Sequence, residues 1–107
     1  DYPAFCIRAA QAVIADQSAG TPALGIVFGG SGNGEQIAAN KVRGIRAALV
    51  WSIATAELAR EHNDANVLVL PARFISNEEA KKVLEAFLST PFDGGRHEKR
   101  ICKIPVR

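Results

Sequence analysis

The sequence predicts an α/β fold in which a doubly wound parallel sheet carries helices on both faces. Three short apolar segments bounded by turn residues alternate with segments whose apolar residues recur at helical spacing. The apolar segments lack polar residues at alternate positions, as is typical of strands that are buried on both sides. A chain of 107 residues that is 48% hydrophobic is long enough for one core. We therefore expect a single three-layer domain over residues 1–107.

The first part of the chain is expected to fold as a helix, a strand and a helix. Residues 4–15 place apolar side chains at helical spacing, and a loop containing glycine and proline follows them. The apolar run ALGIVF, residues 23–28, predicts a buried strand. After a glycine-rich loop, a second helix is expected over residues 34–42, and Gly44 can end it in the left-handed conformation.

The second part repeats this alternation. Residues 45–50 and 66–70 are short and apolar, which predicts two further buried strands, and residues 53–62 predict the helix between them. Three strands are few for a sheet of this type, so we expect an uncovered edge or a missing βα unit.

The last predicted helix, residues 77–88, can be capped at its N-terminus by Ser76 or Asn77. The composition changes after Pro91, and the tail formed by residues 91–107 is basic although the net charge of the chain is only +2. Because aromatic residues are not interleaved with these cations, binding of nucleic acid by base stacking is a weak interpretation. A small phosphorylated ligand suits the tail better.

Composition also limits the compartment and the class of protein. No apolar run approaches the ~20 residues that span a bilayer, and no signal peptide is recognisable, so we expect a cytoplasmic protein with no membrane partner. Cys6 and Cys102 lack the spacing of a metal site or a disulfide framework and are expected to be reduced packing residues. Because the chain starts at Asp1 and contains no methionine, we expect an upstream segment to be missing.

The stretch FGGSGNGE concentrates glycine after the first predicted strand, where ligands bind in open α/β sheets. Its successive N–H groups can form a concave nest for an anion. The glycine spacing matches neither the dinucleotide-binding fingerprint nor a P-loop, so nucleotide binding is a minor alternative. The candidate ligand-binding residues of this loop are Gly30, Gly32, Asn33 and Gly34.

Ser31 and Glu35 add reactive groups to this loop. If a sugar carbonyl lay there, Glu35 could take a proton from the adjacent carbon while loop N–H groups stabilised the resulting enediolate. The structural alternative is that Glu35 only complements the dipole of the helix that it begins.

Two more polar motifs lie farther along the chain. His62 and Asn63 end a predicted helix, where they can complement its dipole and cap it, or transfer a proton and orient a ligand. Arg96 and Arg100 can reach one phosphate if their segment is helical, or they can belong to a solvated tail. Arg73, just after the third predicted strand, is a further candidate for contact with an anion.

The chain resembles the type B ribose-5-phosphate isomerase family, which includes galactose-6-phosphate isomerase subunits, in the stretches GGSGNGEQIAANKVRGIRAAL, AREHNDANVL and GGRHEKR. The resemblance runs in the same order from residue 1 to about residue 104. It implies a Rossmann-like fold, a homodimer or homotetramer, and interconversion of ribose 5-phosphate and ribulose 5-phosphate through an enediolate. It also implies that the reaction needs neither a metal nor another cofactor.

The resemblance also assigns roles to residues. Many members carry a cysteine base at the position of Gly29, and the branch that this chain resembles uses the glutamate that matches Glu35 instead. By resemblance, Ser31 moves protons between substrate oxygens, His62 opens the sugar ring and Asn63 holds the substrate. The residues that would bind phosphate, some of them across a dimer interface, are Arg73, Arg96 and Arg100.

Family members begin with a strand and an Asp-His-Ala-Gly motif whose Asp-His pair lines the site, and this motif is absent from residues 1–107. His97 lies in the tail motif and is not expected to replace that pair. Two alternatives therefore stay open, namely a non-catalytic module for phosphate binding or dimerisation, and an isomerase of a tetrose or hexose phosphate. We expect the basic tail to lie at a subunit interface.

Overall fold

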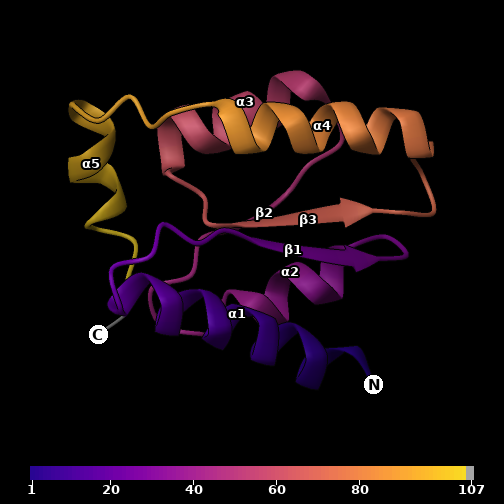
Figure 1. The fold of residues 1–107 in the computed structure, drawn as a ribbon, viewed down its shortest axis with the longest axis horizontal. Coiled ribbons are helices and arrows are strands. Elements are labelled where there is room, and N and C mark those ends of the chain that lie inside the picture. The colour runs from indigo at the N-terminus through magenta and orange to yellow at the C-terminus, as the bar shows by residue number, and fades with distance from the viewer. Residues whose placement is uncertain (106–107) are drawn as a thin grey trace.

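The computed structural model describes residues 1–105, so Arg107 of the basic tail lies outside the described residues. Helices and strands alternate as predicted (Figure 1). The elements are α1 (Tyr2–Ser18), β1 (Gly25–Gly29), α2 (Asn33–Ala39), β2 (Ala47–Leu49), α3 (Ile53–Asn63), β3 (Val67–Pro71), α4 (Asn77–Ser89) and α5 (Arg96–Ile101).

The three strands form one parallel sheet in the order β1-β3-β2. Helices α1 and α2 cover one face and α3 and α4 cover the other (Figure 1), which confirms the predicted three-layer α/β fold. The central strand β3 is buried along its whole length, and its side chains alternate between two cores. Val67 and Val69 pack under α1 and α2, whereas Leu68 and Leu70 pack under α3 and α4.

The prediction that β1 is a buried strand was wrong for one of its faces. Val27 is buried against α1 and α2, but Ile26 is 37% exposed and Phe28 is 67% exposed on the opposite face. The reason is topological, because β1 lies at an edge of the sheet and α3 and α4 pack over β3. An apolar run does not distinguish an edge strand from a central one.

Two helix ends differ from the prediction. Helix α2 ends at Ala39, and Gly44, although its φ is +86°, lies in the turn before β2 and does not cap the helix. Helix α3 includes Asn63, and the left-handed residue that follows it is Asp64, with φ of +45°. By contrast, Ser76 caps α4 as predicted, accepting a hydrogen bond from the backbone N–H of Glu79 at 3.1 Å.

Both cysteines are free, but only Cys6 is a packing residue; Cys102 is exposed at the end of α5 and the packing role expected for it was wrong. Within residues 1–105, no helix combines the length and the apolar character needed to cross a bilayer.

Candidate active site

The predicted site residues lie at opposite ends of the sheet (Figure 1). The carboxyl-end cluster, Gly29 to Glu35 together with Arg73, follows the ends of β1 and β3. The amino-end cluster comprises His62 and Asn63 at the end of α3 and Arg96 and Arg100 on α5.

Strand β3 separates the two clusters. Its five residues make four steps of ~3.3 Å, so the two ends of β3 that the clusters flank are about 13 Å apart. One copy of the chain therefore does not bring its own His62 to its own Glu35.

Glycines, which carry no side chain, leave the space in which the carboxyl-end cluster is built. A Cβ atom at Gly29 would collide with the carboxyl group of Glu35, and one at Gly30 would lie 3.2 Å from Nη2 of Arg73. Neither glycine has a positive φ, so it is space for these two side chains, rather than backbone strain, that calls for glycine here. Gly32 is different, because its φ of +86° at the N-cap of α2 demands glycine.

Backbone hydrogen bonds hold the segment after β3 against the glycine loop. The N–H of Ala72 donates to the carbonyl oxygen of Gly29 at 2.8 Å, and the N–H of Arg73 donates to that of Gly30 at 3.1 Å. Glu35 and Arg73 thus lie against two consecutive glycines. The loop places a carboxylate and a guanidinium group beside the same short piece of backbone.

Ser31 is half-buried in the loop, and its hydroxyl oxygen accepts a hydrogen bond from the backbone N–H of Asn33 at 3.3 Å. This N–H is therefore partly engaged within the loop, which weakens the case for Asn33 as an anion donor. The hydroxyl hydrogen of Ser31 can still be donated to a ligand.

Helix α1 contributes two residues to this end that sequence reasoning missed. The phenol oxygen of Tyr2 lies against Gly34, where a Cβ would collide with it. Burial raises the pKa of the Cys6 thiol, and the charge of the nearby Glu35 carboxylate raises it further, so the thiol is held protonated. Tyr2 and Cys6 are one helical turn apart, and this spacing on an otherwise ordinary amphipathic helix was the only available signal.

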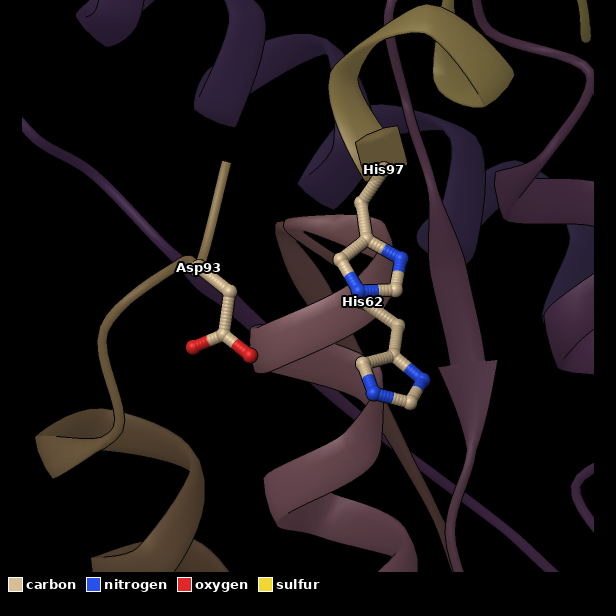
Figure 2. Close-up of side chains that lie close together, drawn as sticks. All are labelled: His62, Asp93 and His97. Carbon is tan, nitrogen blue, oxygen red and sulfur yellow. The ribbon is translucent and has the colours of Figure 1, made fainter. Parts of the chain in front are cut away.

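At the amino end, the rings of His62 and His97 are stacked (Figure 2). Their centroids are 4.3 Å apart and their planes differ by 13°. His97 is buried at the start of α5, whereas Arg96 and Arg100 are exposed on the same helix, one turn apart. The helical spacing on which the two-arginine prediction depended is therefore present.

The surroundings of His97 disfavour its protonation. Burial lowers the pKa of His97, and the positive charges that His62, Arg96 and Arg100 carry or can carry lower it further. The carboxylate of Asp93 acts in the opposite direction and is the weakest of these influences.

The same place holds three side chains of metal-binding type. Ligand atoms of His62, Asp93 and His97 all lie within 4.8 Å of one another (Figure 2). Imidazole lone pairs lie in the plane of the ring, and the planes of two stacked rings are nearly parallel. The lone pairs of the two rings therefore do not converge on one point between the rings. A bound ion at about 2.0–2.1 Å from each nitrogen would require one ring to rotate. The cluster is therefore not a preformed metal centre.

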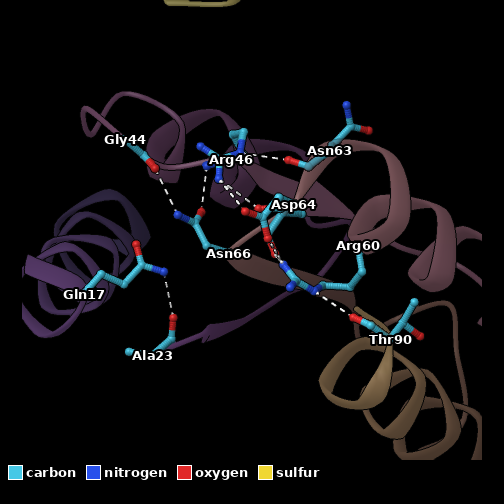
Figure 3. Close-up of polar contacts among 10 residues, drawn as sticks. Gln17, Ala23, Gly44, Arg46, Arg60, Asn63, Asp64, Asn66 and Thr90 are labelled. Atoms are coloured by element: carbon cyan, nitrogen blue, oxygen red, sulfur yellow. Dashed lines mark hydrogen bonds and ion pairs between the residues drawn. The ribbon is translucent and has the colours of Figure 1, made fainter. Parts of the chain in front are cut away.

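A polar network fixes the turn between α3 and β3, directly after His62 (Figure 3). Nε of Arg46 donates to the carbonyl oxygen of Asn63 at 2.8 Å. Nη1 of Arg60 contacts Oδ1 of Asp64 at 2.8 Å, which stabilises this residue in its left-handed conformation. The backbone carbonyl of Asn63 is thus occupied, while its side chain is exposed and able to reach a ligand.

Asn66 completes this network from the interior and is only 2% exposed. Its Oδ1 accepts from the N–H of Arg46 at 2.8 Å, and its Nδ2 donates to the carbonyl oxygen of Gly44 at 2.9 Å (Figure 3). Both of its polar groups are paired, so Asn66 ties the turn before β2 to the start of β3.

Comparison with known proteins relates this arrangement to a family. A family model described as Ribose/Galactose Isomerase matches residues 1–104. Ribose-5-phosphate isomerase B of Mycolicibacterium paratuberculosis is 54% identical over 102 residues, which make up 94% of this chain and 62% of that protein.

Two solved structures are similar throughout the matched region. A ribose 5-phosphate isomerase of Thermotoga maritima has a TM-score of 0.90 at 50% identity, covering 97% of this chain and 69% of that one. Ribose-5-phosphate isomerase B of Mycoplasma genitalium, solved with bound ribulose-5-phosphate, has a TM-score of 0.89 at 47% identity, covering 97% and 66%.

The chain spans about three fifths of the length of the first curated relatives that it matches. The family model covers the residues of both clusters. The chain therefore belongs to the ribose/galactose isomerase family.

Proposed function

We propose that the protein interconverts ribose 5-phosphate and ribulose 5-phosphate through an enediolate, with Glu35 as the general base. The observation that carries this proposal is the position of the Glu35 carboxyl group in the space that a side chain at Gly29 would fill. Other members are expected to carry a cysteine base at that position. A glutamate that reaches back into the same space can present an acceptor to the same substrate carbon.

In this mechanism the Glu35 carboxylate takes the proton from C2 of the open-chain aldose and returns it to C1. Backbone N–H groups of the glycine loop stabilise the charge that develops on the sugar oxygens, and each such donor can contribute ~3–4 kcal/mol in a dry site. The Ser31 hydroxyl moves a proton between O1 and O2. Arg73, beside Gly30, adds positive charge at the same end.

The amino-end cluster opens the sugar ring and binds the parts of the substrate that the carboxyl-end cluster does not contact. His62 opens the sugar ring by proton transfer, Asn63 holds the substrate, and Arg96 and Arg100 bind the phosphate. Because this cluster lies at the far end of the sheet, it must come from a second copy whose amino end faces the carboxyl end of the first. We therefore propose a homodimer or homotetramer in which α5 lies at the subunit interface.

The test is an assay of ribose 5-phosphate conversion, followed by NMR of the sugar, beside tetrose and hexose phosphates. Formation of ribulose 5-phosphate as the fastest reaction supports the proposal. Faster turnover of a four- or six-carbon sugar phosphate would reassign the substrate while keeping the chemistry. The free cysteines fit a reducing compartment, and we propose that the reaction is cytoplasmic.

A second candidate is a non-catalytic module that binds phosphate or mediates dimerisation. It is motivated by the separation of the two clusters, which lie at opposite ends of the sheet within one copy of the chain. Calorimetry with ribose 5-phosphate distinguishes the two candidates, because binding without turnover supports the module and turnover excludes it.

A further inference from the structure

Helix α5 carries two of the three arginines assigned to phosphate, yet it has little intrinsic stability. A helix of six residues is far below the length at which isolated helices form in water. His97 is its one buried residue, at 7% exposure, and Ile101 is half-buried. The position of Arg96 and Arg100 therefore depends on how His97 is held.

The ring of His97 stacks on the ring of His62 at the end of α3 (Figure 2). The segment before α5 is tied to α3 as well, because the N–H of Asp93 donates to the carbonyl oxygen of Glu61 at 3.0 Å. The stacked pair thus joins a residue assigned to ring opening and a helix assigned to phosphate binding.

We propose that His97 is a positioning residue whose neutral ring docks α5 on α3, so that His62, Arg96 and Arg100 form one rigid unit, and that protonation of His97 releases α5. The roles of these three partners rest on the proposed function. The docking of α5 does not, and it can be tested without turnover.

The direction of the pH dependence follows from the groups that face His97. His62 on α3 and Arg96 and Arg100 on α5 disfavour a charge there, and Asp93 in the preceding loop favours it weakly. In the docked helix, the pKa of His97 is lowered from its ordinary value of 6.5. As the pH falls through 6.5, His97 of the released helix is therefore protonated before His97 of the docked helix, and this favours release. Docking is therefore strongest above pH 6.5 and weakens as the pH falls below it.

The experiment compares wild type with His97→Phe, which keeps a flat ring that cannot be protonated, and with His97→Ala, which removes the ring. Backbone ¹⁵N relaxation reports the order of α5, with α4 as the internal reference. Measurements at about pH 7.5 and about pH 5.5 bracket the ordinary histidine pKa. Titration with inorganic phosphate at each pH gives a dissociation constant for every variant.

At the higher pH, we expect α5 to be as ordered as α4 in wild type and in His97→Phe, and mobile in His97→Ala. His97→Ala should also bind phosphate about tenfold more weakly than wild type. At the lower pH, α5 should become mobile in wild type but not in His97→Phe. Comparison with His97→Phe at the same pH cancels the titration of phosphate itself.

The proposal is overturned if α5 stays ordered in His97→Ala, or if wild type and His97→Phe respond identically to acid. Should His97→Ala unfold as a whole, the comparison of wild type with His97→Phe alone decides. If wild type binds no phosphate, the proposed role of the arginines fails, while relaxation still decides the docking of α5.

Discussion

The two ends of this sheet are built in different ways. At the carboxyl end, glycines leave space that the side chains of Glu35, Arg73 and Tyr2 fill, so the chemistry lies against the backbone itself. At the amino end, the candidate groups stand on the last turn of α3 and on the short helix α5, and a histidine stack and a polar turn hold them. The first end resembles a preformed site for proton transfer, and the second a clamp for a charged substrate. In the proposed function, each end supplies groups that the other lacks.

The largest expected effect on activity comes from removing the proposed general base. Glu35→Gln should lower kcat by about 10²–10⁴-fold, because general base catalysis contributes this much, while phosphate affinity stays unchanged. Steady-state kinetics and phosphate titration measure the two quantities. Glu57→Gln, at an exposed position on α3, is the matched control and should behave as wild type. Wild-type rates in Glu35→Gln would end the role of Glu35.

Removing an arginine from the amino end should instead affect substrate binding. Arg96→Ala is expected to raise KM by about ten- to a hundredfold, as charge-assisted hydrogen bonds contribute ~1.5–3 kcal/mol, with a smaller change in kcat. Lys99→Ala, an exposed cation on the same helix, controls for net charge. A loss confined to kcat would contradict the division of labour between the two ends.

Alanine substitutions at the neighbouring positions Gly29 and Gly30 should lower kcat by different amounts. Gly29→Ala pushes the Glu35 carboxyl group aside and is expected to lower kcat about tenfold, whereas Gly30→Ala meets the flexible end of Arg73 at 3.2 Å and should cost about twofold. Kinetics test the order of the two effects, and thermal unfolding of each variant checks that the fold survives. Equal kcat values in Gly29→Ala and wild type would show that the space is not needed for catalysis.

The smallest expected effect is on stability alone. Asn66→Ala leaves the N–H of Arg46 and the carbonyl of Gly44 without their partner, and should lower the free energy of unfolding by about 1–3 kcal/mol. Asn77→Ala, at an exposed position, is the control and should change it by no more than about 0.5 kcal/mol. Urea denaturation measures both, and equal stabilities would show that the network does not stabilise the turn.

Sequence reasoning predicted the alternation of elements because buried parallel strands and amphipathic helices leave distinct patterns. It did not predict the exposure of Phe28, since an edge strand is defined by which strands pair and not by its own residues. It placed Asn63 and not Asp64 in the left-handed cap. Asp64 is held by Arg60, one helical turn before it, and by Arg46, 18 residues away, and the second contact exists only in the folded chain.

The candidate site, like the fold, could be predicted from the sequence only in part. Glu35 was identifiable because motif and resemblance both point to the turn after the first strand. The reason for Gly29, the approach of Tyr2 and Cys6 from α1, and the stacking of His97 on His62 all depend on tertiary packing. Apart from the one-turn spacing of Tyr2 and Cys6, the sequence pattern gives no sign of these contacts.

The central claim is that a complete site forms only between the carboxyl end of one copy and the amino end of another. Co-expression of Glu35→Gln with His62→Ala tests it directly, because half of the resulting dimers combine both chains and one of their two sites is intact. We predict recovery of about a quarter of wild-type turnover from two inactive parents. The pair Glu35→Gln and Arg73→Ala, both altered at the carboxyl end, should recover none. A mixture of Glu35→Gln and His62→Ala that stays as inactive as its parents would contradict the account.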